Sequence, residues 1–166
     1  MLRRIDDFKK DWEYEADATG KVLNALTDES LSQKVTPDGR SLGFLAWHLT
    51  QTLPEMLGGT GLKIDGPGHG MECPTKASDI AAAYEKAAKS VTKEVTENWK
   101  DETLLEKDSM YGETWERGVT LFALIAHQAH HRGQMTVLMR QAGLRVPGIY
   151  GPAKEDWAAM GVPTMQ

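Results

Sequence analysis

The stretch from Leu121 to Met139 constrains the fold most, because it is apolar, long and carries three histidines in its middle. Its residues, LFALIAHQAHHRGQMTVLM, place apolar side chains at intervals of three or four, which is the period of an α-helix. The apolar face of such a helix is expected to pack against other elements. The stretch therefore predicts a buried helix with imidazoles near its packed face.

Two of these histidines, His127 and His131, lie one helical turn apart. Side chains four residues apart on a helix are about 5 to 6 Å apart at their Cβ atoms, so two imidazoles can bind one divalent ion. His130 is the alternative partner of His127. On a helical wheel, His131 shares its stripe with Leu124, Met135 and Leu138. His130 falls on the flank of Ala123, Gln134 and Gln141. Because a ligand pair should face the interior, we predict His127 and His131.

A well-held ion needs a third ligand, and the remaining histidines are His48 and His69. His48 borders the apolar face of SLGFLAWHLTQTL, in which leucines recur at helical spacing. His69 lies in GPGHG, a loop that would have to be held in place before it could bind metal. We therefore predict His48 as the third ligand. The alternative is that these histidines are core residues, each of which would need a polar partner.

The residues HxxHHRGQ at 127–134 and LAWHL around His48 resemble the DinB/YfiT-like family of metal-dependent proteins. The similarity extends over nearly the whole chain, including VPGIYGP at 146–152. The resemblance implies a four-helix bundle, commonly a homodimer, whose divalent ion is bound by three histidines. Carried over by position, these are His48, His127 and His131. Some members resemble S-transferases that use bacillithiol, mycothiol or glutathione, and others include a maleylpyruvate isomerase, so the resemblance indicates the site better than the reaction.

Length and charge narrow the class of protein. The 166 residues predict a single domain, 1–166, that buries a core without disulfides. A net charge of −5 without a basic cluster argues against nucleic acid as a partner. The single cysteine, Cys73, is consistent with a reducing compartment, and we do not expect it to be a nucleophile. Charges run through the amino-terminal segment and no run is apolar enough to span a bilayer, so we expect a cytoplasmic protein without a membrane partner.

Four amphipathic segments without strand alternation predict an all-α four-helix bundle with long connecting loops. The first helix should run from about Ile5 to Leu26. Ser41 is expected to cap the second, which should kink or end at Pro54 and be finished by the segment 57–61, LGGTG. The buried stripe expected on the first helix is Ile5, Phe8, Trp12, Ala16, Thr19, Leu23 and Leu26.

The second half of the chain should contain the other two helices. A Gly/Pro-rich loop reaching Thr75 precedes the third helix, which starts near Ser78. Residues 101–118 are polar and irregular, with a possible short hairpin around Tyr111-Gly112. The fourth helix should begin between residues 115 and 120 and end near Gln141, with Gly143 as its C-terminal cap. The tail after Pro147 is expected to pack across the bundle or against a partner subunit.

Three neutral imidazoles leave one position of a four-coordinate zinc open, whereas structural zinc sites usually have four protein ligands. The open position favours chemistry on a water or a thiol. Nickel, iron or manganese suit the same ligands. We therefore predict a metal-dependent enzyme, S-transferase-like or hydrolase-like, that attacks a small electrophilic substrate, with catalytic residues unassigned. The alternative is a non-catalytic, stress-associated metal-binding dimer. No P-loop, GxGxxG, CxxC or nucleophile–base pair suggests another mechanism.

Several other side chains have expected roles near the site. Arg132 points about 100° away from His131 on the helix and should bind protein, such as a carboxylate or a helix end. The candidates to orient the histidine rings by accepting from their second nitrogens are Gln51, Glu55 and Gln134. The alternative is that these side chains only solvate the helix surface, which we favour for Glu55. The aromatic residues that either line a substrate pocket or belong to the core are Trp47, Tyr111, Tyr150 and Trp157.

Overall fold

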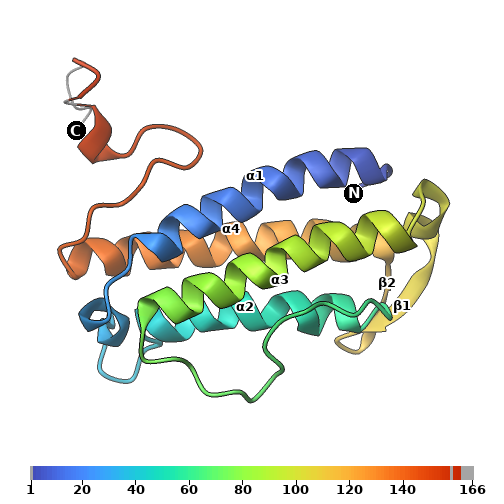
Figure 1. Cartoon of the computed structure of the whole chain (residues 1–166), viewed down its shortest axis with the longest axis horizontal. Coiled ribbons are helices and arrows are strands. Elements are labelled where there is room, and N and C mark those ends of the chain that lie inside the picture. Colours follow the sequence, from blue (N-terminus) through green and yellow to red (C-terminus); the bar gives the residue numbers. More distant parts are fainter. Residues whose placement is uncertain (1, 158, 162–166) are drawn as a thin grey trace.

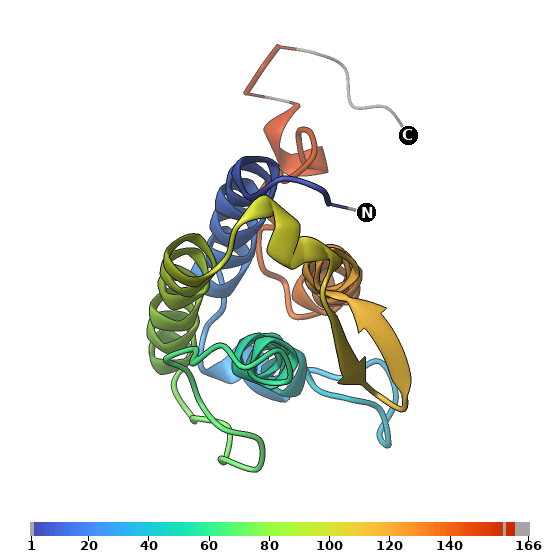
Figure 2. The same cartoon turned by 90° about the vertical axis from the view of Figure 1, so that its right-hand side faces the viewer.

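The computed structural model describes residues 2–157 and 159–161 and contains the four expected helices (Figure 1). Their bounds are α1 (Ile5–Asn24), α2 (Leu42–Gly58), α3 (Ala77–Asn98) and α4 (Arg117–Gln141). Viewed along the bundle in Figure 2, they follow one another as α1, α3, α2 and α4, and each helix packs on its two neighbours. The predicted all-α four-helix bundle is confirmed. Short 3-10 helices lie at Glu29–Ser32, Asp101–Leu105 and Lys154–Asp156.

The helix directions explain the longest connection. α2 and α3 run the same way along the bundle, opposite to α1 and α4 (Figure 1). A connection between parallel neighbours must return over the length of the bundle, as crossover loops do in other bundles. Residues 59–76 make that return, which is the long Gly/Pro-rich loop expected from the sequence. The consequence is that α2 and α4 are antiparallel neighbours.

The first helix buries a slightly different stripe from the expected one. Phe8 and Trp12 are fully buried, and the Trp12 indole nitrogen donates to the Ala88 carbonyl of α3 at 3.1 Å. Ala16, expected in the core, is only half-buried, while Glu15 is 6% exposed. The interior follows the spacing 12, 15, 19 and 22, so a carboxylate occupies a core position. The helix also ends at Asn24, two residues before the expected Leu26.

The second helix begins as expected and ends at Gly58, within the segment 57–61 expected to finish it. Ser41 caps it by accepting from the Phe44 backbone N–H at 3.1 Å. The expectation that Pro54 could end the helix is wrong, because α2 continues through it to Gly58. Proline removes one backbone donor, and the buried residues Leu53, Met56 and Leu57 keep this last turn packed in the core.

The segment before α4 forms the suspected hairpin. β1 (Lys107–Met110) pairs antiparallel with β2 (Glu113–Glu116). The turn residues Tyr111 and Gly112 have φ of 53° and 84°, and positive φ at both central residues is what a two-residue hairpin turn of type I′ requires. α4 then ends at Gln141, and Gly143 with φ of 74° provides the expected C-terminal cap.

The C-terminal tail leaves α4 and passes to the outer side of α1 (Figures 1 and 2). The Tyr14 hydroxyl of α1 donates to the Ile149 carbonyl, and Tyr150 reaches Glu15 on the same helix. The tail therefore packs across the bundle, one of its two expected courses. Within the described residues, every helix is too short or too polar to cross a membrane.

Candidate metal centre

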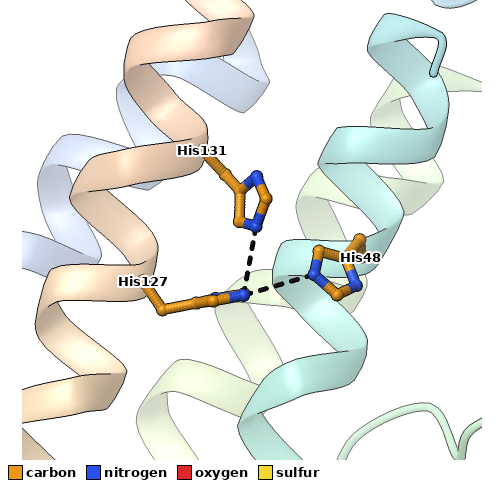
Figure 3. A group of neighbouring side chains, drawn as sticks. All are labelled: His48, His127 and His131. Atoms are coloured by element: carbon orange, nitrogen blue, oxygen red, sulfur yellow. Dashed lines mark hydrogen bonds between the residues drawn. The ribbon is translucent and has the colours of Figure 1, made fainter. Parts of the chain in front are cut away.

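Three predicted histidines meet in the seam between α2 and α4 (Figure 3). The Nε2 atom of His127 lies 3.2 Å from Nε2 of His48 and 3.1 Å from Nε2 of His131. One nitrogen from each ring falls within a group whose members are all within 4.8 Å of one another. We call these three residues the histidine cluster. Its geometry is that of a group that could hold a metal ion.

Local helix geometry brings the cluster together. His127 and His131 lie one turn apart on α4, and His48 reaches them from the antiparallel α2. His131 is 6% exposed, while His48 and His127 are half-buried. His130 is exposed and its ring lies beside His131, with centroids 4.8 Å apart, but it is not part of the cluster. The structure thus places His131, and not His130, in the histidine cluster.

The three ring nitrogens fit a cation better than they fit one another. Each Nε2 has one in-plane site, either a proton or a lone pair. His127 Nε2 therefore cannot make a proper hydrogen bond to both neighbours at once. An ion accepts all three lone pairs, and Zn–N bonds of about 2.0 to 2.1 Å at tetrahedral angles place ligand nitrogens about 3.3 Å apart. The two separations from His127 Nε2, 3.2 Å and 3.1 Å, are close to that value.

Electrostatics keep the three rings neutral, which is the form that binds metal. Burial lowers the pKa of His127 to about 4, helped by repulsion from His131, His48 and His130. Burial also lowers the pKa of His48 and of His131. The lone pairs are consequently available at neutral pH.

Gln134 orients one of the rings, as predicted. Its side-chain oxygen lies 2.7 Å from Nδ1 of His131, so Nδ1–H donates to it and Nε2 keeps its lone pair for the cluster. The other two candidates for this role bind elsewhere. The Gln51 amide donates to the Gly68 and Met71 carbonyls of the long loop, and Glu55 accepts from the Tyr111 hydroxyl. Among the described residues, no hydrogen-bond partner is found for Nδ1 of His127, which is buried.

Two exposed side chains extend from the cluster towards solvent. Phe44, one turn before His48 on α2, stacks on its ring with centroids 6.0 Å apart. The guanidinium of Arg40 lies 5.0 Å above the Phe44 ring. Within the ranges that the structure describes, Arg40 forms no ion pair. An aromatic face and a cation therefore lie beside the histidine cluster.

The remaining loop candidates do not join the cluster. His69 stays exposed in the long loop and is absent from the metal-binding group. Partial burial raises the pKa of the Cys73 thiol, whose Sγ contacts the Gly43 carbonyl at 3.5 Å. A raised pKa disfavours the reactive thiolate.

The four aromatic residues considered as pocket walls do not lie together. Trp47 is buried on α2 and its indole donates to the Met71 carbonyl, while Tyr111 is at the hairpin turn. Tyr150 and Trp157 belong to the C-terminal tail. A cavity of about 710 Å³ lies between α1 and α3, and its lining includes Tyr84 but none of the three histidines.

Gln128 was not singled out from the sequence. It is fully buried on α4, directly after His127. Its amide nitrogen donates to the Leu49 carbonyl of α2 at 3.3 Å. The signal was present, because Gln128 occupies a core position of the three-four repeat on α4. That repeat runs through Leu121, Leu124, Gln128, His131, Met135 and Leu138, all buried.

Comparisons with known proteins agree with this architecture. The model of the DinB family matches residues 1–165. The uncharacterized protein YrdA of Bacillus subtilis is 48% identical over 162 residues, which are 98% of this chain and 97% of that protein. A crystal structure of a DinB-like protein from Bacillus cereus has 44% identity and a TM-score of 0.87, covering 90% of this chain and all of its own. The DinB-like protein YjoA of Bacillus subtilis, at 14% identity and a TM-score of 0.68, shares the fold over 89% of this chain and 99% of its own.

Proposed function

The chain belongs to the DinB family, and from that premise we propose that it is a metal-dependent enzyme whose divalent ion is bound by His48, His127 and His131. The single observation that carries the proposal is the convergence of their three Nε2 atoms. Zinc suits three neutral imidazoles, and nickel, iron or manganese suit the same donors. Three protein ligands leave a position for a substrate or water, unlike a site closed by four.

The residues around the ion have different roles in this proposal. When bound, the ion supplies Lewis-acid chemistry, lowering the pKa of a water or thiol at its open position. Gln134 fixes the orientation of the His131 ring through Nδ1. Phe44 and Arg40 offer an aromatic face and a positive charge to a small electrophile that arrives from solvent. The nucleophile is a low-molecular-weight thiol in the S-transferase version of this proposal and water in the hydrolase version.

A second candidate function is a non-catalytic metal-binding dimer in which the ion only joins helices. The observation that favours it is the origin of the ligands on two different helices, α2 and α4. In that case chelation would lower thermal stability, and neither thiol conjugation nor ester hydrolysis would be detected with any of the four metals. The homodimer is common to both candidates and predicts a solution mass about twice the 18.4 kDa of one chain.

The test begins with elemental analysis of untagged protein purified without chelators, beside His131→Ala and the matched variant His130→Ala. We expect about one divalent ion per chain in the wild type and in His130→Ala, and none in His131→Ala. Conjugation of a model electrophile with a low-molecular-weight thiol, and hydrolysis of a model ester without it, are then measured with the metal found. Metal content and turnover that survive in His131→Ala would refute the proposal.

A further inference from the structure

Gln128 joins the two helices of the histidine cluster at the level of the cluster itself. It follows His127 on α4, and its amide nitrogen donates to the carbonyl of Leu49, which follows His48 on α2. The bond thus connects the immediate chain neighbours of two residues whose Nε2 atoms are 3.2 Å apart. Gln128 has no solvent exposure, so water does not compete for this bond.

Two hydroxyl groups fix the orientation of the Gln128 amide. Its oxygen lies 3.1 Å from the Thr19 hydroxyl of α1 and 3.1 Å from the Tyr84 hydroxyl of α3. The Thr19 oxygen already accepts from Arg132 Nη1 at 2.9 Å, so its own proton is free to donate to Gln128. Burial raises the pKa of Tyr84, which keeps its hydroxyl protonated as a donor. With the oxygen held by two donors, the amide nitrogen must face Leu49.

All four helices therefore meet at one side chain. α1 and α3 each contribute a hydroxyl to the oxygen, α4 carries the amide, and α2 contributes the Leu49 carbonyl. An apolar residue in this core position would fill the same space without a directional contact. Burying a polar side chain costs desolvation free energy unless its polar atoms are hydrogen-bonded. Here both the oxygen and the nitrogen of the Gln128 amide have partners. This arrangement specifies the spacing and register of α2 against α4.

We propose that Gln128 is a positioning residue that sets the α2–α4 spacing and thereby holds the histidine cluster ready for its ion. The inference rests on the proposed function, since it concerns the same three ligands. Gln128 does not touch the ion. It acts through the backbone beside His48, as hydrogen-bond partners behind metal ligands act through the ligands they orient. Sites whose supporting contacts are removed become too loose to bind well.

The test measures Zn²⁺ affinity by competition with a chromophoric chelator, and the visible spectrum of the Co²⁺-loaded protein. The variant is Gln128→Leu. Its matched control is Trp12→Phe, which removes another buried side-chain donor to a main-chain carbonyl, that of Ala88, between α1 and α3. Unfolding of the metal-free proteins by urea is measured for both, so that any loss of affinity can be compared with the loss of stability.

We expect Gln128→Leu to weaken Zn²⁺ binding by about 10- to 100-fold, the usual effect of removing a partner that supports a ligand. Its Co²⁺ spectrum should also change. Trp12→Phe should lose stability while keeping the wild-type affinity and spectrum. If Gln128→Leu does not fold, Gln128→Met serves instead, because its unbranched side chain has nearly the same length and removes the amide donor to Leu49 without adding a buried charge.

Two results overturn the inference, and they are distinguishable. Wild-type protein that binds neither Zn²⁺ nor Co²⁺ would remove the proposed function and this inference together. Wild-type protein that binds both ions, with unchanged affinity and spectrum in the Gln128 variant, would leave the metal site standing and remove only the positioning role.

Discussion

Two polar clusters lie on neighbouring faces of α4 and differ in how completely the protein satisfies them. The histidine cluster faces α2, whereas Arg132 faces α1, where it meets Glu15, Thr19 and Tyr150 in what we call the arginine cluster. Arg132 Nη2 pairs with the Glu15 carboxylate and donates to the Tyr150 hydroxyl at 2.6 Å. Tyr150 in turn donates to Glu15 at 2.7 Å. The expectation that Arg132 binds protein is confirmed, because its partner is a carboxylate.

The difference between the clusters separates a structural network from a candidate ligand site. In the arginine cluster, the Arg132 cation, the Glu15 anion and the hydroxyls of Thr19 and Tyr150 are joined by hydrogen bonds. Among the described residues, Arg132 Nε is the one buried polar side-chain atom of this cluster without a partner. In the histidine cluster, the Nε2 atom of His127 lies 3.2 Å from that of His48 and 3.1 Å from that of His131. A polar network whose members are hydrogen-bonded to one another needs no added ligand. Three converging ring nitrogens form a group that could hold an ion.

The largest expected effect on the unfolding free energy comes from removing the carboxylate of the arginine cluster. Glu15→Ala leaves Arg132, which is 2% exposed, as a buried and unpaired charge. Breaking a buried ion pair in this way costs about 3 to 5 kcal/mol of unfolding free energy, measured by urea denaturation of the metal-free protein. The control is the double variant Glu15→Leu with Arg132→Met, which should be far closer to wild type. A loss below about 1 kcal/mol in Glu15→Ala would mean that water reaches Arg132.

The histidine cluster should instead increase the stability of the protein only when a metal ion is added. Zinc at about 1,000 times its dissociation constant should raise the unfolding free energy of the wild type by about 4 kcal/mol. It should have little effect on His131→Ala, since one of the three ligands is missing. Glu15→Ala, provided it folds, should keep most of the zinc-dependent increase. An equal increase in wild type and His131→Ala would move the binding site elsewhere.

The pH dependence of the unfolding free energy of the metal-free protein should be a smaller effect than zinc binding. It should come from the imidazole rings of the histidine cluster. The pKa of His127 is about 4 in the folded protein and about 6.5 in the unfolded chain. The unfolded chain therefore binds more protons between these values, so stability rises with pH across this window. The contribution is complete above about pH 6.5 and is lost as the pH falls towards 4. Solvent around the half-buried ring reduces its size.

Urea midpoints between pH 7 and pH 5, where most carboxylates stay ionised, measure this effect. His127→Gln should flatten the curve, because glutamine has no proton to gain. His130→Gln is the matched control, since His130 is exposed. The same slope in wild type and His127→Gln would show that other groups cause the loss of stability.

Much of the fold and of the histidine cluster was predictable from local patterns. The helical period separated His131 from His130, because one side of a wheel is buried and the other is not. Ser41, the Tyr111-Gly112 turn and Gly143 each carry a local backbone requirement that a few residues express. The strands themselves were not evident, since β1 and β2 have four residues each and alternation cannot be recognised over so short a length.

The rest depends on contacts between distant segments. Gln51 and Glu55 were candidates to support the histidines because they are close to His48 in sequence, with solvation of the helix surface as the alternative. The structure instead turns them towards the long loop and the hairpin. The helical period could place Glu15 and Gln128 in the core, but their partners come from other helices. A buried polar residue in a core stripe is thus a sign of a network whose members a single sequence does not name.

The smallest expected effect tests whether the arginine cluster depends on the tail. Tyr150→Phe removes one hydroxyl, and the variant should lose about 1 kcal/mol, because a single hydrogen bond contributes little when its partners keep others. Arg132 still contacts Glu15 and Thr19. Tyr150 is also 67% exposed, so water can replace its hydroxyl. Urea denaturation checks this beside Tyr14→Phe, which removes the other hydroxyl contact to the tail. A loss as large as that of Glu15→Ala would mean that the tail closes the cluster, and the contrast with the histidine cluster would then depend on residues outside the bundle.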